Sequence, residues 1–100
     1  MTFKDLVFAP RQFGGIGCHT EINGFILSVQ ASAFNYCDPR VDMDSEKDYK
    51  TFEVAIWEAA EPRTWVTNRF LDVNNDVCGH MTRDEINDLI KRIEFRQFIN

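Results

Sequence analysis

CHTEINGFILSV, residues 18–29, holds two β-prone runs on either side of Asn23-Gly24. Both central residues of a type I′ turn take positive φ, and Asn-Gly is the pair that adopts this most readily. The stretch therefore predicts a tight β-hairpin. Side chains alternate between the two faces of a strand, so the apolar face of the second run is the expected core face. Its members are Phe25, Leu27, Val29, Ala31 and Ala33.

Further strands are predicted on both sides of the hairpin. TFEVAIWEA, residues 51–59, alternates between an apolar face and a face that carries Trp57. Its apolar face consists of Phe52, Val54 and Ile56. Residues 61–63 contain the turn sequence Glu-Pro-Arg, and residues 64–72 are predicted to return as another strand. Residues 3–8 are predicted as a short first strand or an extended arm.

The C-terminal part of the chain carries the pattern of a capped amphipathic helix. Thr82 followed by Glu85 predicts a capping box, in which the hydroxyl accepts a backbone N–H and the glutamate reaches back to the cap. The helix is predicted to run from about Arg83 to Phe95 or a little beyond. Apolar side chains recur three and four residues apart and form one stripe. They are Ile86, Leu89, Ile90 and Ile93.

Two strand pairs followed by one helix predict an α+β fold. The expected architecture is a four- or five-stranded antiparallel sheet with one C-terminal helix packed on one face. Because one helix covers one face, the other face is expected to expose a mixture that includes Trp57, with Phe34 or Trp65 as further members. The length of 100 residues fits a single domain, residues 1–100.

Composition narrows the class of protein. The chain is 44% hydrophobic with nine Phe and two Trp, which is enough to fill a core. No apolar run approaches the length of a membrane span, and the first residues lack the pattern of a signal peptide. Three cysteines in such a chain indicate free thiols in a reducing, cytoplasmic setting. The net charge of −5 argues against a nucleic-acid-binding surface and favours a basic partner.

Residues 72–76 resemble the start of a calcium loop. Asp72, Asn74 and Asp76 have the spacing of the first three oxygen ligands of an EF-hand. That loop needs glycine at its sixth position and glutamate at its twelfth, where this chain has valine and arginine. A rearranged loop could still recruit Glu85. The helix cap competes for the same carboxylates, and we favour the cap because it accounts for more residues.

A zinc site is a second metal hypothesis. Cys78 and His80 are separated by one residue, so both side chains could point the same way. With Cys18, His19 or Cys37 they could complete a set of cysteine and histidine ligands. The short ligand pairs typical of zinc sites are absent, and the competing interpretation is a turn before the helix. No cofactor is assigned.

The chain is not predicted to be an enzyme, because no catalytic set is visible. Cys18-His19 looks like a nucleophile and its base, but neighbours on a strand point to opposite faces. Gly14, Gly15 and Gly17 lack the lysine and the helix start of a phosphate loop. These glycines are predicted to form a flexible loop.

Residues 38–48 form an acidic segment with two interpretations. The plain one is a solvated, mobile loop, because Pro39 and dense like charge oppose packing into a sheet. The sharper one is a recognition surface for a basic protein face, with Tyr36 as an aromatic anchor. The candidate partner-binding residues are Tyr36, Asp38, Arg40, Asp42, Asp44, Glu46, Asp48 and Trp57.

Several short motifs span most of the chain: TFKDLVFAP, the glycine loop, INGFILSV, FEVAIW and DVCGHMTRDEINDLIKRI. Together they resemble a group of short, mostly uncharacterised accessory proteins of tailed bacteriophages. Those proteins tend to show an F-K-D-L-x-F opening, an N-G-Y-G-x-S-V hairpin, an L-Y-E-L-A-V strand and a D-D-V-I-G-x-L-T-x-E-E-V ending. This chain departs from the pattern in its longer acidic segment and in Asn74-Asn75.

The resemblance implies a non-structural accessory protein that acts in a bacterial cytoplasm. In the group's pattern Asp76 falls in a turn and Cys78 replaces an isoleucine, which weakens both metal hypotheses. We therefore predict a protein that binds a host protein, with inhibition of a host enzyme or defence complex as one form of that function. The alternative is a calcium- or zinc-binding domain. A homodimer is a further option, and neither a membrane nor direct nucleic-acid contact is expected.

Overall fold

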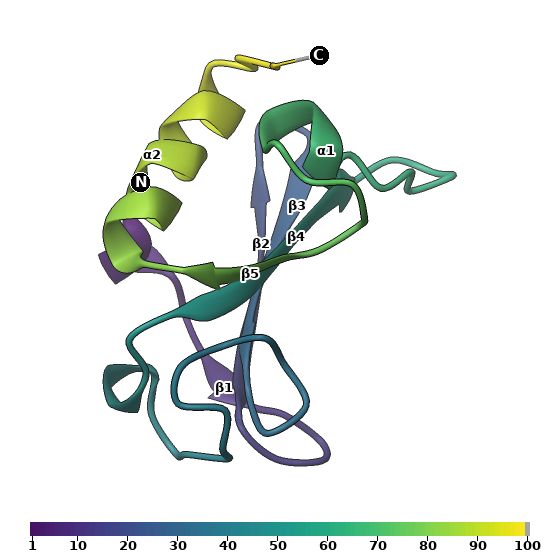
Figure 1. Ribbon diagram of the computed structural model, residues 1–100. Helices are drawn as coiled ribbons and strands as arrows, with labels where there is room; N and C mark the ends of the chain where they lie inside the picture. Colours follow the sequence, from purple (N-terminus) through teal and green to yellow (C-terminus); the bar gives the residue numbers. More distant parts are fainter. Residues whose placement is uncertain (100) are drawn as a thin grey trace.

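The structure, a computed structural model, describes residues 1–99 and is built around one antiparallel sheet (Figure 1). Its five strands follow the order β1-β2-β3-β4-β5, so each strand pairs with the next one in sequence. The strands are β1 (Ala9–Pro10), β2 (Ile16–Ile22), β3 (Phe25–Ala31), β4 (Phe52–Glu58) and β5 (Cys78–Met81). The helices are the 3-10 helices η1 (Phe3–Asp5) and η2 (Glu46–Asp48), and the α-helices α1 (Thr67–Phe70) and α2 (Arg83–Glu94). The predicted α+β fold is confirmed.

The central hairpin forms as predicted. Ile22 pairs with Phe25 across the turn, and Asn23 and Gly24 have φ of 48° and 88°. Two consecutive positive φ values are what a type I′ turn requires, which explains why this pair of residues joins β2 to β3. The strand boundaries differ slightly from the prediction. Gly17 belongs to β2 instead of the glycine loop, and Ala33 lies beyond the end of β3.

One face of the sheet packs against α2 and forms the core (Figure 1). The alternating apolar residues of β3 and β4 meet the apolar stripe of α2, as the sequence pattern predicts. The fully buried residues of this contact are Leu27, Val29, Phe52, Val54, Ile56, Ile86, Leu89, Ile90 and Ile93. Burial of each such side chain stabilises the fold by roughly 1.5–3 kcal/mol, so this face holds most of the stability.

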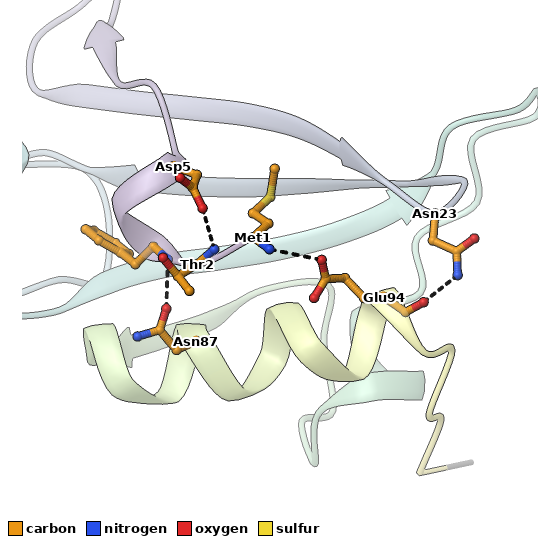
Figure 2. Close-up of polar contacts among 7 residues, drawn as sticks. Met1, Thr2, Asp5, Asn23, Asn87 and Glu94 are labelled. Carbon is orange, nitrogen blue, oxygen red and sulfur yellow. Dashed lines mark hydrogen bonds and ion pairs between the residues drawn. The ribbon is translucent and has the colours of Figure 1, made fainter.

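The N-terminal segment closes the core beside α2 (Figure 2). It was predicted as a strand or arm, but it forms η1 and places Phe3 in the core. The Phe3 N–H donates to Asn87 Oδ1 at 2.7 Å, and the Met1 amino group lies 3.3 Å from Glu94 Oε2. Asn23 Nδ2 donates to the Glu94 carbonyl at 2.7 Å. These contacts tie the N-terminus, the hairpin turn and α2 together.

The capping box at the start of α2 is confirmed. The Glu85 N–H donates to Thr82 Oγ1 at 3.2 Å, and the Thr82 N–H donates to Glu85 Oε1 at 3.0 Å. Both bonds satisfy backbone donors that the first helical turn leaves without partners. The helix ends at Glu94, just short of the predicted end.

The prediction of a strand at residues 64–72 is wrong. Only Trp65 pairs with β4, as an isolated bridge to Trp57, and the chain then turns into α1. The Thr67 hydroxyl accepts the Ile56 N–H at 2.9 Å and lies 2.7 Å from the Asp76 carbonyl oxygen. A side chain thus takes the place of the backbone in the ladder and ends the pairing.

The last strand, β5, was predicted as a turn before the helix. It pairs with β4 through Met81 opposite Phe52 and Cys78 opposite Val54, with an irregularity between the two pairs. Gly79 packs directly under Tyr36: a Cβ atom at this position would lie 2.6 Å from the Tyr36 Cβ. A long-range contact with the segment after β3 therefore determines the path of β5.

Candidate binding groove

The face of the sheet opposite α2 carries the side chains that alternate with the core residues, and we call it the open face. Its members are His19, Glu21, Ile26, Ser28, Gln30, Glu53, Ala55 and Trp57. A groove of about 590 Å³ lies on this face. Its walls are Phe13 from the β1–β2 loop, Asn35 from the β3–β4 loop and Trp65 from the segment after β4.

A row of three rings runs along the groove. The His19 and Trp57 ring centres lie 5.2 Å apart at 87°, and the Trp57 and Trp65 ring centres lie 5.0 Å apart at 60°. Edge-on contacts of this kind hold aromatic side chains in one orientation. Trp65 nevertheless leaves 48% of its surface exposed, and Phe13, which also lines the groove, leaves 79%. The groove therefore presents a prearranged and accessible aromatic surface.

A hydrogen-bonded network fixes the part of the groove that is lined by Arg11, Asn35 and Glu53. Arg11 Nη1 donates to Ser32 Oγ at 2.5 Å and to Asn35 Oδ1 at 2.7 Å. Asn35 Nδ2 in turn donates to Glu53 Oε1 at 3.0 Å, and Glu53 Oε2 accepts the Tyr36 N–H at 2.8 Å. Each polar group is engaged with its neighbours, so the network holds the β1–β2 and β3–β4 loops against β4 and gives the groove its shape.

Tyr36 and Arg40, two of the predicted contact residues, lie together at the end of the sheet. The Arg40 guanidinium carbon lies 4.9 Å from the centre of the Tyr36 ring, and Arg40 Nε donates to the Ala33 carbonyl at 3.3 Å. The Tyr36 carbonyl accepts the His80 N–H at 2.9 Å, which ties this segment to β5. Both side chains are exposed and form a cation–aromatic surface.

The predicted acidic residues follow the loop between β3 and β4. Asp42 Oδ1 accepts the Ala33 N–H at 2.9 Å, and Asp42 and Asp44 line a hollow beside Gly14. The exposed carboxylates of the loop are those of Asp38, Asp42, Asp44 and Asp48. Because Gly14 follows Phe13 in the chain, the acidic loop and the aromatic groove meet at this turn. Trp57 lies within the groove itself.

The C-terminal part of the acidic segment folds against α2. It forms η2, with Ser45 as its N-cap, and Arg83 donates to the carbonyls of Glu46 at 2.6 Å and Tyr49 at 2.8 Å. Tyr49 is buried, and its burial raises the pKa of its hydroxyl group. A segment predicted as a mobile loop is therefore anchored at this end by a buried ring and a two-fold arginine contact.

The residues of the calcium hypothesis are not gathered into one site. Asp72, Asn74 and Asp76 are exposed in the segment between α1 and β5, while the Glu85 carboxylate is engaged in the capping box. Asp76 takes part in the fold through its backbone carbonyl, which accepts a bond from Thr67. Within residues 1–99, no group of three or more His, Cys, Asp or Glu side chains is placed to hold a metal ion.

The zinc and dyad residues are distributed over different surfaces. Cys18 is buried in the core and His19 is exposed on the open face, as strand alternation predicts. His80 is exposed with φ of 55°, while Cys78 beside it is half-buried. Burial raises the pKa of the Cys37 and Cys78 thiols. Thiols with raised pKa stay protonated at neutral pH and are weak nucleophiles and ligands.

Sequence patterns identified Trp57 but missed most of the groove around it. The register could have placed two further groove residues: Ser28 lies between His19 on β2 and Ala55 on β4, and Gln30 lies opposite Glu53. The Asn23-Gly24 turn predicts the register between β2 and β3, but it does not predict the register between β3 and β4. The walls carried no local signal, because they come from three loops that meet through tertiary contacts.

Comparisons of the chain with protein-family models, with curated proteins and with solved structures found no match. The function is therefore inferred from the groove and the surfaces beside it. Among residues 1–99, no helix has both the length and the apolar character needed to cross a bilayer.

Proposed function

We propose that this protein is a binding module for another protein and that the groove on the open face is its contact surface. The supporting observation is the placement of Trp57 and Trp65, which are the two tryptophans of the chain. Both line the groove, in contact with each other, on the face that α2 leaves free. An exposed aromatic surface rimmed by polar groups is typical of protein interaction sites.

The chemistry of the groove supports a protein partner. Tryptophan, tyrosine and arginine are the residues that most often dominate the binding energy at protein interfaces, and they act from pockets with polar rims. Here Trp57 and Trp65 form the centre, and the amide and carboxylate groups of Gln30, Asn35 and Glu53 form the rim. On such a surface the aromatic side chains are expected to contribute most of the binding energy, and the polar rim adds hydrogen bonds.

The acidic loop supports a partner with a basic face. Asp42 and Asp44 lie beside Gly14, next to the groove wall at Phe13, so a partner seated in the groove would reach them. The net charge of the chain is −5. Opposite charges at the rim of an interface accelerate association and select partners, more than they add affinity. The net negative charge also favours a protein over a nucleic acid.

We extend the proposal to a setting on the strength of the motif resemblance alone. The protein would act as a non-catalytic accessory protein of phage type in a bacterial cytoplasm and bind a host protein, with inhibition of a host enzyme or defence complex as the form of that action. A surface that binds tightly by aromatic anchors can block a partner's own site without any chemistry.

The test is affinity capture from bacterial lysate followed by titration of the purified partner. The Trp57→Ala/Trp65→Ala variant should lose the partner. The control variant Phe95→Ala should keep it, because Phe95 is equally apolar and 72% exposed but lies at the end of α2. Since both tryptophans lie in the groove, their emission spectrum should shift when the partner binds the wild-type protein.

Two results would contradict the proposal. A partner that binds the double tryptophan variant as tightly as the wild type would remove the groove as the contact surface. A purified partner that binds without any change in tryptophan emission would place the contact elsewhere. The acidic loop has its own test, in which the affinity of Asp44→Ser is compared with that of the wild type over a range of salt concentrations. If Asp44→Ser binds as tightly as the wild type at every salt concentration, the acidic loop is not part of the contact, although the groove still can be.

A further inference from the structure

The outer edge of β2 is open over most of its length. β1 pairs with β2 only at Ile16 and Gly17, because β1 is two residues long, and the exposed Val7 before it lines a hollow with Cys18 and His19 without pairing to them. Within residues 1–99, no strand pairs with the outer side of residues 18–22. An exposed strand edge is a template for pairing with another strand. Figure 2 shows β2 at the outer side of the sheet, leading to the turn at Asn23.

The free backbone groups of this edge can be assigned. In a two-residue hairpin the flanking residues Ile22 and Phe25 form a hydrogen-bonded pair, and such pairs then alternate along the ladder. The backbone N–H and C=O groups of even-numbered residues of β2 therefore bond to β3. The backbone groups of odd-numbered residues point away from β3, toward the outer edge. The Arg11 N–H donates to the Gly15 carbonyl at 3.0 Å on the outer side, which agrees with this parity. His19 and Glu21 thus direct their N–H and C=O groups to solvent.

We propose that two copies of this protein pair through the outer edges of their β2 strands, antiparallel about a two-fold axis at Thr20. In this register His19 lies opposite the partner subunit's Glu21, and Glu21 lies opposite the partner subunit's His19. Both residues have outward backbone groups, so each of the two pairs exchanges two backbone hydrogen bonds.

The side chains complement each other in the same register. His19 and Glu21 are both exposed on the open face, so each imidazole stands beside a carboxylate across the interface. Thr20 meets its own copy at the axis, and threonine pairs are favourable neighbours across strands. A two-fold contact requires a surface complementary to itself, and this short segment satisfies that condition.

Neighbouring registers are disfavoured by charge and by space. Moving the axis to Glu21 would place two carboxylates directly opposite each other, which is destabilising. Moving it to His19 would bring Glu21 opposite the partner subunit's Gly17, whose outer side is already paired with Ala9. In the register centred on Thr20, the paired segment of each copy stops at its own hairpin turn at one end. At the other end it stops before the residues of β2 that pair with β1.

Pairing through β2 is a property of the protein alone and does not depend on the partner proposed above. It would join two five-stranded sheets into one continuous sheet. Because the two-fold axis is perpendicular to the joined sheet, the two open faces would lie side by side, each with His19 packed against Trp57. A partner with two contact segments could bind both grooves at once.

A charge-swap series measured by analytical ultracentrifugation tests the pairing. The wild type should dimerise as its concentration rises. His19→Glu should weaken the dimer by about tenfold or more, because it sets two glutamates opposite each other in both pairs. Glu21→His should also weaken it, and the double variant His19→Glu/Glu21→His should restore it. Gln97→Glu, which adds the same charge at an exposed position away from β2, should have no effect.

Amide hydrogen exchange gives a second, residue-specific measurement. The His19 and Glu21 amides should become protected as the concentration rises, whereas the Thr20 amide, bonded to β3, should be protected at all concentrations. A wild type that stays monomeric throughout the series would overturn the proposal. So would a dimer that the single variants leave intact, or one that the double variant fails to restore. A dimer with unprotected His19 and Glu21 amides would place the contact on another surface.

Discussion

The two faces of the sheet are built from the same strands and yet differ in composition and in what determines them. On β4, Phe52, Val54 and Ile56 face α2 and are fully buried. On the other face of that strand, Glu53 and Trp57 are only half-buried and line the groove. A side-chain period of two separates the faces, so one strand contributes to the core on one side and to the groove proposed as a binding surface on the other.

The difference shows that local sequence pattern positions the residues of the core face, whereas tertiary contacts position those of the open face. The core face needs only apolar residues at alternate positions and a helix with a matching stripe. The open face needs defined neighbours: Trp65 must return to Trp57, and the network from Arg11 to Glu53 must hold two loops in place. The buried apolar contacts are thus concentrated on one face, and the groove proposed as the binding surface lies on the other.

The largest expected difference in stability is between two variants that each truncate one aromatic residue of β4, one on the core face and one on the open face. Phe52→Ala should lower the free energy of unfolding by about 3–5 kcal/mol, because its ring is fully buried among those of Phe3, Phe8 and Tyr49. Trp57→Ala should lower it by only about 1–2 kcal/mol, since Trp57 loses edge-on ring contacts on a half-exposed surface. Urea unfolding of both variants measures the contrast. Equal losses would mean that the open face is a second core.

A smaller effect is expected at the cap of the covering helix. Thr82→Ala should lower the free energy of unfolding by about 1 kcal/mol, because the Glu85 N–H loses its acceptor at the start of α2. Thr82→Ser keeps the hydroxyl and should stay close to the wild type. An unchanged urea midpoint for Thr82→Ala would show that α2 is held by its buried stripe without help from its cap.

The smallest effect compares two carboxylates of the acidic loop. Asp42→Ala should cost about 0.5–1.5 kcal/mol, because the Ala33 N–H loses a charged acceptor. Asp44→Ala should stay within about 0.5 kcal/mol of the wild type, as substitutions at exposed positions usually do. Asp42→Asn retains an acceptor oxygen and serves as the control. Equal melting temperatures for Asp42→Ala and Asp44→Ala would show that the rim beside the groove does not depend on Asp42.

The elements with strong local signals were predictable. The hairpin follows from Asn23-Gly24, α2 follows from its cap and its apolar stripe, and the strand that became β4 follows from alternation. In each case residues close in sequence determine the structure, so tertiary contacts reinforce a preference that the segment already has.

The remaining elements depend on partners far away in sequence. Residues 64–72 are as β-prone as a strand, but the Thr67 side chain replaces the backbone in the ladder with β4. η1 forms because Phe3 is drawn into the core beside Asn87, 84 residues further along. The path of β5 depends on Tyr36 above Gly79. None of these contacts leaves a periodic signature in the segment itself.

The meander order of the sheet has a consequence for how the chain folds. Each strand pairs with its neighbour in sequence, so the ladder can grow outward from the central hairpin at small cost in loop closure. The contacts between the N-terminal segment and α2 join opposite ends of the chain. We expect the hairpin to be ordered in the folding transition state and the two ends to lock together only afterwards, so damage to that final contact would speed unfolding and leave the rate of folding unchanged.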